Sequence, residues 1–268
     1  MDEFKSPLAP DANAGRVAVV TGGGTGIGRA ITRELARTGA KVAICGRRGE
    51  PLAAVARELE AAGAECIDQP CDIREPEQVA GFLNAVDQSF GGADILVNNA
   101  GGQFGNTPEN VSLKGWRAVH LLTVDAAWNM THEVANRWMI PGRGGFVGFI
   151  GFSPRRGIPQ FAHASAARAA LENLAQGLSQ EWSRYGIRTV AVVPGYVDTE
   201  GAREAYGDEE MDKSAKQIPI GRLVTAEEVA ALVAYLTTPA AAAITGTSVV
   251  IDGGLDAWGI GEPPPPPE

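Results

Sequence analysis

The stretch Thr21-Gly22-Gly23-Gly24-Thr25-Gly26-Ile27-Gly28 decides the fold of this 268-residue chain. It follows the apolar run Val17–Val20 and precedes a helical pattern, so its glycines mark a tight turn between a strand and a helix. Such a turn lets the backbone approach a pyrophosphate closely, and the free N–H groups at the helix start favour an anion. The pattern therefore predicts a dinucleotide-binding β-α-β unit.

Strands and helices alternate along the rest of the chain. Apolar runs predict seven strands, at 17–20, 41–45, 64–69, 95–98, 146–150, 188–193 and 248–251. Helical patterns occupy 26–38, 50–62, 75–90, 112–139, 161–184 and 225–237. This alternation predicts an α/β fold: a single Rossmann-type, doubly wound, parallel seven-stranded sheet with helices on both faces. The polar stretch from Pro194 to Gly221 predicts an irregular connection that acts as a lid or binding loop.

Composition bounds the domain and its surroundings. Residues 15–258 are expected to form the domain, between a flexible arm at 1–14 and a Pro-rich disordered tail at 259–268. The net charge of −9 argues against binding to nucleic acid or to an anionic membrane. Because no run is long and apolar enough to span a bilayer and no signal peptide is recognisable, we expect a cytoplasmic protein. The three cysteines are expected to be buried free thiols, and no metal site is expected.

The end of the second strand indicates which dinucleotide is used. An Asp or Glu at this point favours NAD(H), because its carboxylate accepts hydrogen bonds from the ribose. This chain instead has Cys45-Gly46-Arg47-Arg48. A guanidinium binds a 2′-phosphate in a bidentate manner, whereas a carboxylate repels it. The sequence thus predicts NADP(H) as the cofactor, with Arg47 and Arg48 as ligands of the 2′-phosphate.

Several motifs resemble those of the short-chain dehydrogenase/reductase family, over about residues 14–258. They are Thr21–Gly28, Asp72-Ile73, Asn98-Asn99-Ala100-Gly101, Pro194-Gly195 with Thr199, and Ile251-Asp252-Gly253-Gly254. The resemblance implies that Asp72 and Ile73 hold the adenine and that Asn99–Gly101 line the inner ribose. It also implies a group of residues beside the nicotinamide carboxamide, namely Pro194, Gly195, Val197 and Thr199. With the glycine loop, the expected cofactor-binding residues are Gly22, Gly24, Thr25, Gly26, Ile27, Gly28, Arg47, Arg48, Asp72, Ile73, Asn99, Ala100, Gly101, Arg168, Pro194, Gly195, Val197 and Thr199.

The catalytic tetrad of that family is absent. Where the family carries Asn, Ser, Tyr and Lys, this chain carries Thr123, Gly151, Ala164 and Arg168. A positioned acid protonates the oxygen in carbonyl reduction, so the loss of the phenol argues against ketone or alcohol chemistry. Four side chains remain as catalytic candidates. Three of them are possible hydrogen-bond or proton donors, namely Thr123, Ser153 and His163. The fourth, Arg168, is expected to reach the nicotinamide ribose.

One branch of the family is more similar than the rest. Asn98–Phe104, Lys114-Gly115-Trp116 and His163–Ala169 are similar to the peroxisomal trans-2-enoyl-CoA reductases, and more loosely to the 2,4-dienoyl-CoA reductases. The resemblance implies NADPH-dependent reduction of a carbon–carbon double bond conjugated to a thioester. In that reaction charge develops on the thioester oxygen, so hydrogen-bond donors at this oxygen matter more than a Tyr–Lys pair. The substrate is then a small acyl thioester.

The missing tetrad leaves two other functions open. One is a cofactor-binding pseudoenzyme that serves as a regulatory or assembly subunit, and the other is a non-redox cyclase or isomerase in the same cleft. The resemblance further implies a homo-oligomer, with a tetramer favoured, because family members pair the helices expected at 112–139 and 161–184. Trp138 and Trp182 are expected to fill the seam between such helices.

Overall fold

The computed structural model describes residues 4–257, apart from the side chain at position 143. Its main feature is a parallel sheet of seven strands in the order β3-β2-β1-β4-β5-β6-β9. The strands are β1 Val17–Thr21, β2 Lys41–Gly46, β3 Cys66–Pro70, β4 Ile95–Asn98, β5 Gly145–Ile150, β6 Ile187–Pro194 and β9 Thr247–Ile251. Every predicted strand is confirmed, with ends within two residues of those expected.

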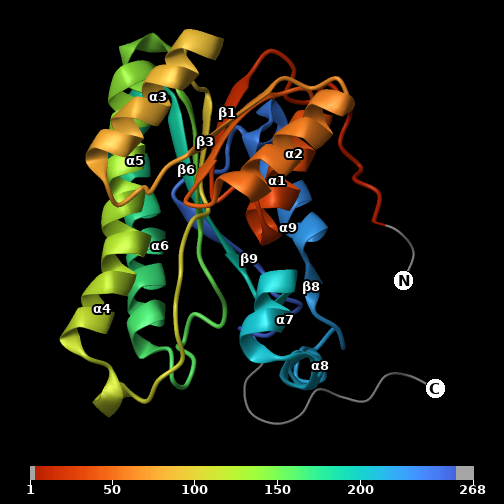
Figure 1. Cartoon of the computed structure of the whole chain (residues 1–268), viewed down its shortest axis with the longest axis vertical. Coiled ribbons are helices and arrows are strands. Elements are labelled where there is room, and N and C mark those ends of the chain that lie inside the picture. The colour runs from red at the N-terminus through yellow and green to blue at the C-terminus, as the bar shows by residue number, and fades with distance from the viewer. Residues whose placement is uncertain (1–3, 258–268) are drawn as a thin grey trace.

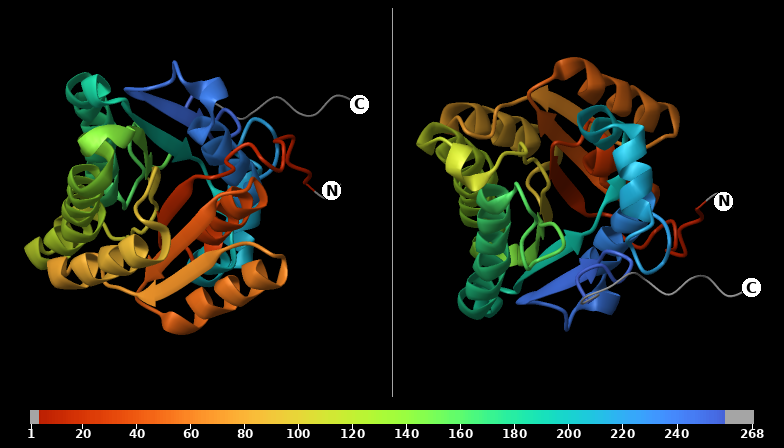
Figure 2. Two further views of the ribbon diagram at one scale, coloured as in Figure 1. Left: turned by 90° about the horizontal axis from the view of Figure 1, so that it is seen from above. Right: turned by 90° about the horizontal axis from the view of Figure 1, so that it is seen from below.

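Helices cover both faces of this sheet, as Figures 1 and 2 show. One face carries α1 (Gly26–Arg37), α2 (Gly49–Ala61) and α9 (Ala226–Thr237). The other face carries α3 (Pro76–Phe90), α5 (Ala126–Val134) and α6 (Ala162–Trp182). Each layer buries an apolar core against the sheet, and the predicted doubly wound α/β fold is confirmed.

The helix expected at 112–139 is continuous but changes its winding. It begins as α4 (Leu113–His120), widens into a π-helical turn at Leu121–Asp125, continues as α5, and ends in a second π-helical stretch, Ala135–Arg143. A π-helical turn rotates the following side chains about the helix axis. Position 123 lies within the first of these turns.

The segment from Pro194 to Gly221, expected to be irregular, is largely helical. It contains β7 (Val197–Asp198), α7 (Glu200–Tyr206) and α8 (Asp208–Ala215), and β7 pairs with β8 (Val224–Thr225) in a second small sheet. The helices escaped prediction because they are short and mostly exposed, and so carry polar residues. Their inner side rests on a small apolar cluster formed by Met211, Ile218 and Leu223.

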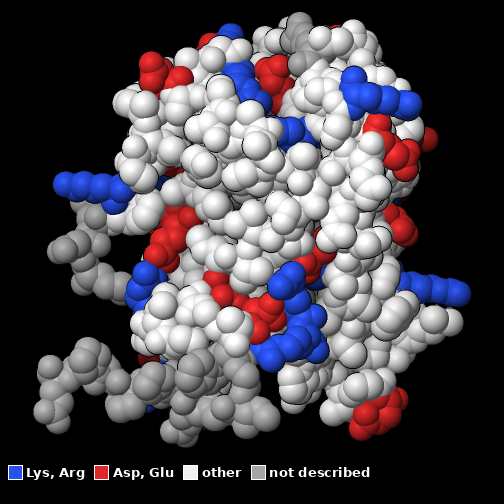
Figure 3. All heavy atoms as spheres, turned by 180° about the vertical axis from the view of Figure 1, so that it is seen from behind, with Lys and Arg blue, Asp and Glu red and all other residues white. Residues whose placement is uncertain are grey.

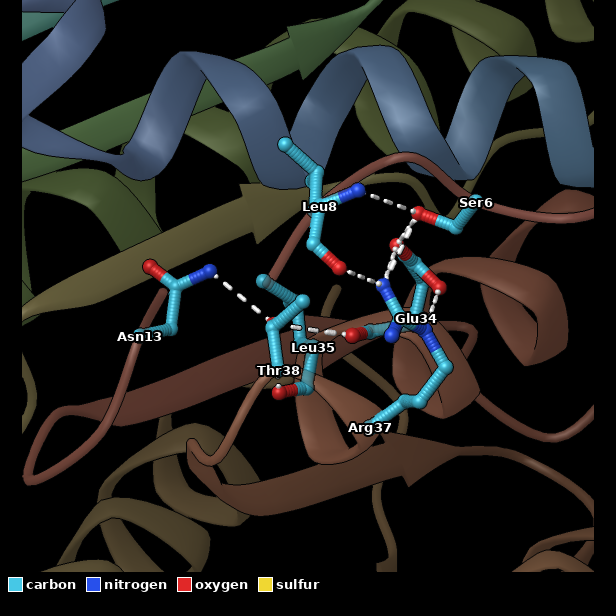
Figure 4. Close-up of polar contacts among 7 residues, drawn as sticks. All are labelled: Ser6, Leu8, Asn13, Glu34, Leu35, Arg37 and Thr38. Carbon is cyan, nitrogen blue, oxygen red and sulfur yellow. Dashed lines mark hydrogen bonds and ion pairs between the residues drawn. The ribbon is translucent and has the colours of Figure 1, made fainter. Parts of the chain in front are cut away.

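The arm predicted to be flexible at 1–14 lies against α1 where it is described (Figure 4). The Ser6 hydroxyl donates to Glu34, and Arg37 donates to the Leu8 carbonyl oxygen at 3.1 Å. The buried Asn13 amide donates to Thr38 Oγ1 at 3.0 Å. These hydrogen bonds place the arm against α1, and the flexibility expected for residues 1–14 stays a prediction. The predicted tail at 259–268 lies outside the described residues.

The described surface is mixed in charge. On the face drawn in Figure 3, basic and acidic side chains stand next to one another, and no basic stripe crosses the described residues there. No helix within residues 4–257 is both long and apolar enough to cross a membrane.

Candidate active site

A cavity of about 620 Å³ lies beyond the carboxyl ends of β1 and β4. Strand order reverses between these two strands, and ligands of open α/β sheets bind at this point. The Thr21 hydroxyl oxygen joins the strand ends, because it accepts hydrogen bonds from the N–H groups of Asn99 and Ala100, both at 3.0 Å. The Asn99 amide donates in turn to the Thr21 carbonyl oxygen at 2.9 Å. These bonds hold the loop after β4 beside the glycine loop.

The glycine loop has no room for side chains at its two critical positions. At Gly22, where φ is +69°, a Cβ atom would lie 2.9 Å from the Asn99 amide nitrogen. At Gly28 a Cβ atom would lie 2.1 Å from the Gly22 carbonyl oxygen. Thr25 precedes α1 but makes no side-chain capping hydrogen bond, so the first N–H groups of the helix remain free for an anion. This cradle fits a dinucleotide pyrophosphate.

Two exposed arginines, Arg47 and Arg48, line the same cavity. Neither has an ion-pair partner within residues 4–257. Asp72 also lines the cavity, but Arg74 Nε donates to its carboxylate at 2.9 Å, and this hydrogen bond holds the pKa of Asp72 below its usual value. Arg74 provides the main contact of Asp72, and the interaction of Arg47 with that carboxylate is the weakest of those that lower its pKa, so the positive charge of Arg47 and Arg48 remains available for a phosphate. Sequence reasoning missed Arg74, since a local ion pair leaves no pattern of its own.

The structure brings the predicted cofactor-binding residues together around two adjoining cavities and a groove. The first cavity is lined by Gly22, Gly24, Thr25, Ile27, Gly28, Arg47, Arg48, Asp72, Ile73, Asn99, Ala100, Gly101 and Thr199. Gly26 lies in a neighbouring groove with Arg48 and Thr199. The second cavity, of about 740 Å³, is lined by Arg168, Pro194, Gly195 and Val197, and it shares Ile27, Asn99 and Thr199 with the first.

We call the second cavity the substrate cleft. Phe161 and Arg168 of the α6 region line one side, and residues of α7 and α8 from Ala202 to Ser214 line the other. The helices that sequence reasoning left as an irregular loop therefore form one wall of the cleft. Thr199 lies where the cleft meets the cofactor cavity, and its side chain caps α7 by accepting from the Ala202 N–H at 3.2 Å.

Arg168 places a partly buried cation in the substrate cleft. Its guanidinium donates to the Ile150 carbonyl oxygen and packs against the backbone of Gly101. Burial lowers the pKa of Arg168 to about 10, so the side chain stays charged at neutral pH. No carboxylate pairs with it among the residues that the structure describes. The charge is therefore available to an anionic group in the cleft.

The position of the missing phenol is closed off. Ala164 is 1% exposed and packs with Val119 and Ala167 in a cluster that Phe152 and Phe161 cover. Gly151, at the position of the missing serine, lines the cleft without a polar group. Neither position offers an acid.

Two of the predicted donors do not reach the cleft. Thr123 and His163 are each 1% exposed, and neither lines the cleft. The His163 ring packs on Phe104 with ring centroids 4.4 Å apart, and burial lowers the pKa of His163, so the imidazole is neutral at pH 7. The burial of both side chains in the helical packing argues against the hypothesis that they donate to a substrate.

The hydroxyl of Ser153 lies at the cleft but is already used. It donates to the Asp252 carboxylate, which also accepts from the N–H groups of Gly254 at 2.9 Å and Asp256 at 2.7 Å. Asp252 thus ties the loop after β5 to the chain that follows β9. Ser153 therefore has a structural contact in the described residues, and its role as a donor to a substrate stays a prediction.

Two tyrosines that sequence reasoning did not single out also line the cleft. Tyr196 follows β6, and Tyr206 is the last residue of α7. Burial raises the pKa of Tyr196. Both lie in the segment without recognisable helix or strand signals, so nothing in the sequence indicated where their phenols would point.

The chain is similar to known proteins over most of its length. A protein-family profile described as Enoyl-(Acyl carrier protein) reductase matches residues 22–256. A Caenorhabditis elegans protein named probable 2,4-dienoyl-CoA reductase 3 is 37% identical over 264 residues, which cover 96% of this chain and 85% of that protein. Gluconate 5-dehydrogenase of Gluconobacter oxydans is 33% identical over 244 residues, which cover 90% of this chain and 95% of that protein.

A similar solved structure is the actinorhodin polyketide ketoreductase with NADPH. It superposes with a TM-score of 0.87 at 32% identity, covering 93% of this chain and 100% of that one. The names of these relatives state different reactions, so the choice of substrate depends on what lines the cleft.

Proposed function

The chain belongs to the short-chain dehydrogenase/reductase family, and from this premise we propose that it reduces the carbon–carbon double bond of an enoyl-CoA-like thioester with NADPH. Membership of the family supports an oxidoreductase with a nicotinamide cofactor. The observation that carries the finer proposal lies on α6. There Ala164 is buried in place of the phenol, and the cation of Arg168 lines the cleft in place of the lysine.

The residues around the first cavity suit NADPH. The glycine loop and the uncapped start of α1 take the pyrophosphate, and Arg47 and Arg48 take the 2′-phosphate. Pro194, Gly195, Val197 and Thr199 are assigned to the nicotinamide side. When bound, NADPH supplies the hydride.

The charge in the cleft favours conjugate reduction over ketone reduction. Conjugate reduction places negative charge on the thioester oxygen, and the guanidinium of Arg168 stabilises such a charge. Ketone reduction instead needs an acid beside the carbonyl oxygen, typically worth about 10²–10⁴-fold in rate. Ala164 has no proton to give, and Arg168 does not release one at neutral pH, so the α6 side of the cleft holds no acid; the phenols of Tyr196 and Tyr206 come from the segment after β6. Water suffices as the proton source at C2 of the thioester.

The test is a substrate panel. NADPH oxidation is followed by absorbance with trans-2-enoyl-CoA and 2,4-dienoyl-CoA thioesters, and separately with ketones, while alcohols are tested with NADP⁺. We expect turnover with the unsaturated thioesters alone. Saturated acyl-CoA of the same chain length is the control, because it has no double bond to reduce. Activity on ketones or alcohols with none on the thioesters would refute the proposal.

A cofactor-binding protein without catalysis is the second candidate. It is favoured by one observation: of the four predicted catalytic side chains, Thr123 and His163 are buried and the hydroxyl of Ser153 is bound to Asp252. This candidate predicts NADPH binding in calorimetry and no turnover on any member of the panel. A non-redox cyclase or isomerase would instead change the mass or retention of a substrate while the NADPH absorbance stays constant.

We also propose a homo-oligomer, with a tetramer favoured. The long helix that runs from α4 through α5 exposes a row of apolar side chains, namely Leu113, Trp116, Leu121 and Trp128. Helix α6 exposes the alanines Ala162, Ala166 and Ala169. The expected seam residues Trp138 and Trp182 are corrected, because each is only 9% exposed and belongs to the core. Trp128 is 42% exposed and stacks on Trp182 with ring centroids 6.5 Å apart, so it replaces them at the surface.

A further inference from the structure

We propose that Tyr206 is the substrate-binding phenol of the cleft, and that its hydroxyl donates a hydrogen bond to the thioester carbonyl oxygen. The inference rests on the proposed function. Helix α6 cannot provide a phenol for the substrate oxygen, because Ala164 stands at that position, and we assign this contact to Tyr206, the last residue of α7.

Tyr206 closes one end of the cleft through contacts with two other elements. Gln103, in the loop after β4, donates from Nε2 to Tyr206 Oη at 3.5 Å. Phe161, immediately before α6, meets the Tyr206 ring edge-on, with centroids 6.2 Å apart and an interplanar angle of 73°. All three residues line the cleft, so the phenol stands where segments far apart in the sequence converge.

The partners of Tyr206 are themselves held in place. The Asn106 N–H donates to the Gln160 carbonyl oxygen at 2.9 Å, which joins the loop after β4 to the loop before α6. The Phe161 ring packs on Gly105, where a Cβ atom would lie 3.4 Å from Cζ. Tyr206 is 42% exposed, but its ring contacts Phe161 and its oxygen contacts Gln103. A phenol held in this way loses little conformational freedom when it binds a ligand.

The hydroxyl hydrogen of Tyr206 is free to be donated. An amide NH₂ group can only donate, so the phenol oxygen acts as the acceptor in the contact with Gln103. Among residues 4–257 no group accepts the Tyr206 O–H. The phenol of Tyr206 and the cation of Arg168 therefore give the cleft a pair of donors, which is what a developing oxyanion requires.

Tyr196 is the competing phenol in the cleft. Its side chain packs against the apolar cluster of Met211, Ile218 and Leu223, beneath α7 and α8. This packing suits a residue that supports the wall of the cleft. Tyr206 lies at the surface of that wall, so we assign the substrate contact to Tyr206 and keep Tyr196 as a comparison.

The experiment measures kcat and KM for a trans-2-enoyl-CoA with the full chain and three Tyr→Phe variants. Tyr206→Phe keeps the ring contact with Phe161 and removes only the hydroxyl. We expect kcat/KM to fall by about ten- to a hundred-fold, with most of the loss in kcat, because the hydrogen bond strengthens as charge develops on the oxygen. Tyr196→Phe should change kcat/KM far less. Tyr235→Phe, on α9 and similarly exposed, is the matched control and should behave as the unmodified protein.

A second measurement separates this inference from the proposed function. Calorimetry gives the Kd of a saturated acyl-CoA for the protein loaded with NADP⁺, and Tyr206→Phe should weaken that binding by a smaller factor than it lowers kcat/KM, because the carbonyl oxygen of the bound acyl-CoA carries no developing charge. If the unmodified protein turns over enoyl thioesters and Tyr206→Phe equals it, or if Tyr196→Phe carries the loss, the assignment fails and the proposed function stands. If the unmodified protein binds thioesters without turnover, the proposed function fails and the difference in Kd still decides on Tyr206. A protein that neither binds nor reduces thioesters overturns both.

Discussion

The guanidinium of Arg168 fills the space in which a side chain at Gly101 would stand: a Cβ atom there would lie 2.3 Å from Nη2. The loop after β4 therefore needs a residue without a side chain at position 101, because the guanidinium lies directly over it. Burial opposes that charge, as the lowered pKa of Arg168 indicates. A charged group kept at a cost in stability, and lining a cleft, is typical of a functional site.

The first prediction concerns how much the buried charge of Arg168 lowers the free energy of unfolding. The Arg168 pKa of about 10 in the folded protein lies well below that of an unburied arginine, so the full penalty applies at every pH below about 10 and shrinks as the pH rises from there toward the pKa of the unfolded chain. Arg168→Met should therefore raise the free energy of unfolding, by on the order of 1–3 kcal/mol, while lowering kcat by about ten-fold or more. Urea unfolding at neutral pH and the thioester assay measure the two effects. Arg168→Lys is the control that keeps a cation. A loss of stability together with activity would mean that Arg168 is structural.

The second prediction uses the Gly101 contact. In Gly101→Ala the new methyl group meets the flexible end of Arg168 rather than backbone, so the guanidinium should move and the fold should survive. We expect a clear loss of activity with little change in melting temperature. In the Arg168→Met background the same change should have almost no further effect, since the pair acts as one unit. Gly81→Ala on α3 is the matched control, because nothing lies within 4 Å of a Cβ atom there. Additive losses in the double variant would disprove the coupling.

The third prediction concerns cofactor preference. Replacing Gly46 by Asp and Arg47 by Gln removes an attraction for the 2′-phosphate and adds a repulsion. NADPH should then bind about ten- to a hundred-fold more weakly, and the preference should move toward NADH. Calorimetric titration of both cofactors at two salt concentrations checks this, because an exposed charge contact weakens with salt. Arg57→Gln, an exposed arginine of α2 outside the cavity, is the control. Equal or tighter binding of NADH by the unmodified protein would contradict the assignment of NADP(H).

The fourth prediction concerns assembly. Trp128→Glu places a charge in the row of exposed apolar residues on the long helix. If that row is the interface, the substitution should shift the mass measured by light scattering toward the monomer, because an unpaired charge is costly to bury. Gln88→Glu adds the same charge to the exposed side of α3 and should leave the mass unchanged. An unmodified protein that is monomeric at micromolar concentration would remove the proposal.

The fifth prediction concerns pH and the start of α9. Glu228 binds Arg222 at 2.7 Å and accepts from the Thr225 N–H at 2.8 Å, and the contact with Arg222 holds the pKa of Glu228 below its ordinary value. The stabilising effect of the Glu228 carboxylate is therefore complete above the ordinary glutamate pKa of about 4.3. It is lost as the pH falls through the lower pKa that Glu228 has in the folded protein. Glu228→Gln should cost about 1 kcal/mol at neutral pH, and the difference should shrink in acid. Urea unfolding across a pH series tests this, with the exposed neighbour Glu227→Gln as control. A difference that does not vary with pH would argue against the ion pair.

The residues of the cofactor cavity were predictable because their signals are local. Apolar runs and helical patterns report which segments form strands and helices, and parallel strands then place their carboxyl ends along one edge without further information. Gly22 and Arg47 lie directly after such ends, and Gly28 lies in the first turn of the helix that follows β1, so their meeting followed from the order of the strands. The segment 200–215 was harder, because two short helices that are mostly exposed resemble a polar loop.

The sequence by itself determined the fold, the glycine cradle and the absence of a phenol at Ala164. Only the tertiary structure decided which of the remaining polar side chains reach the cleft. Packing between helices buried Thr123 and His163, a contact with the distant Asp252 occupied Ser153, and the folding back of α7 brought Tyr206 to Gln103. The physical reason is that the exposure and hydrogen bonding of a side chain depend on neighbours far away in the chain, and no local pattern records them.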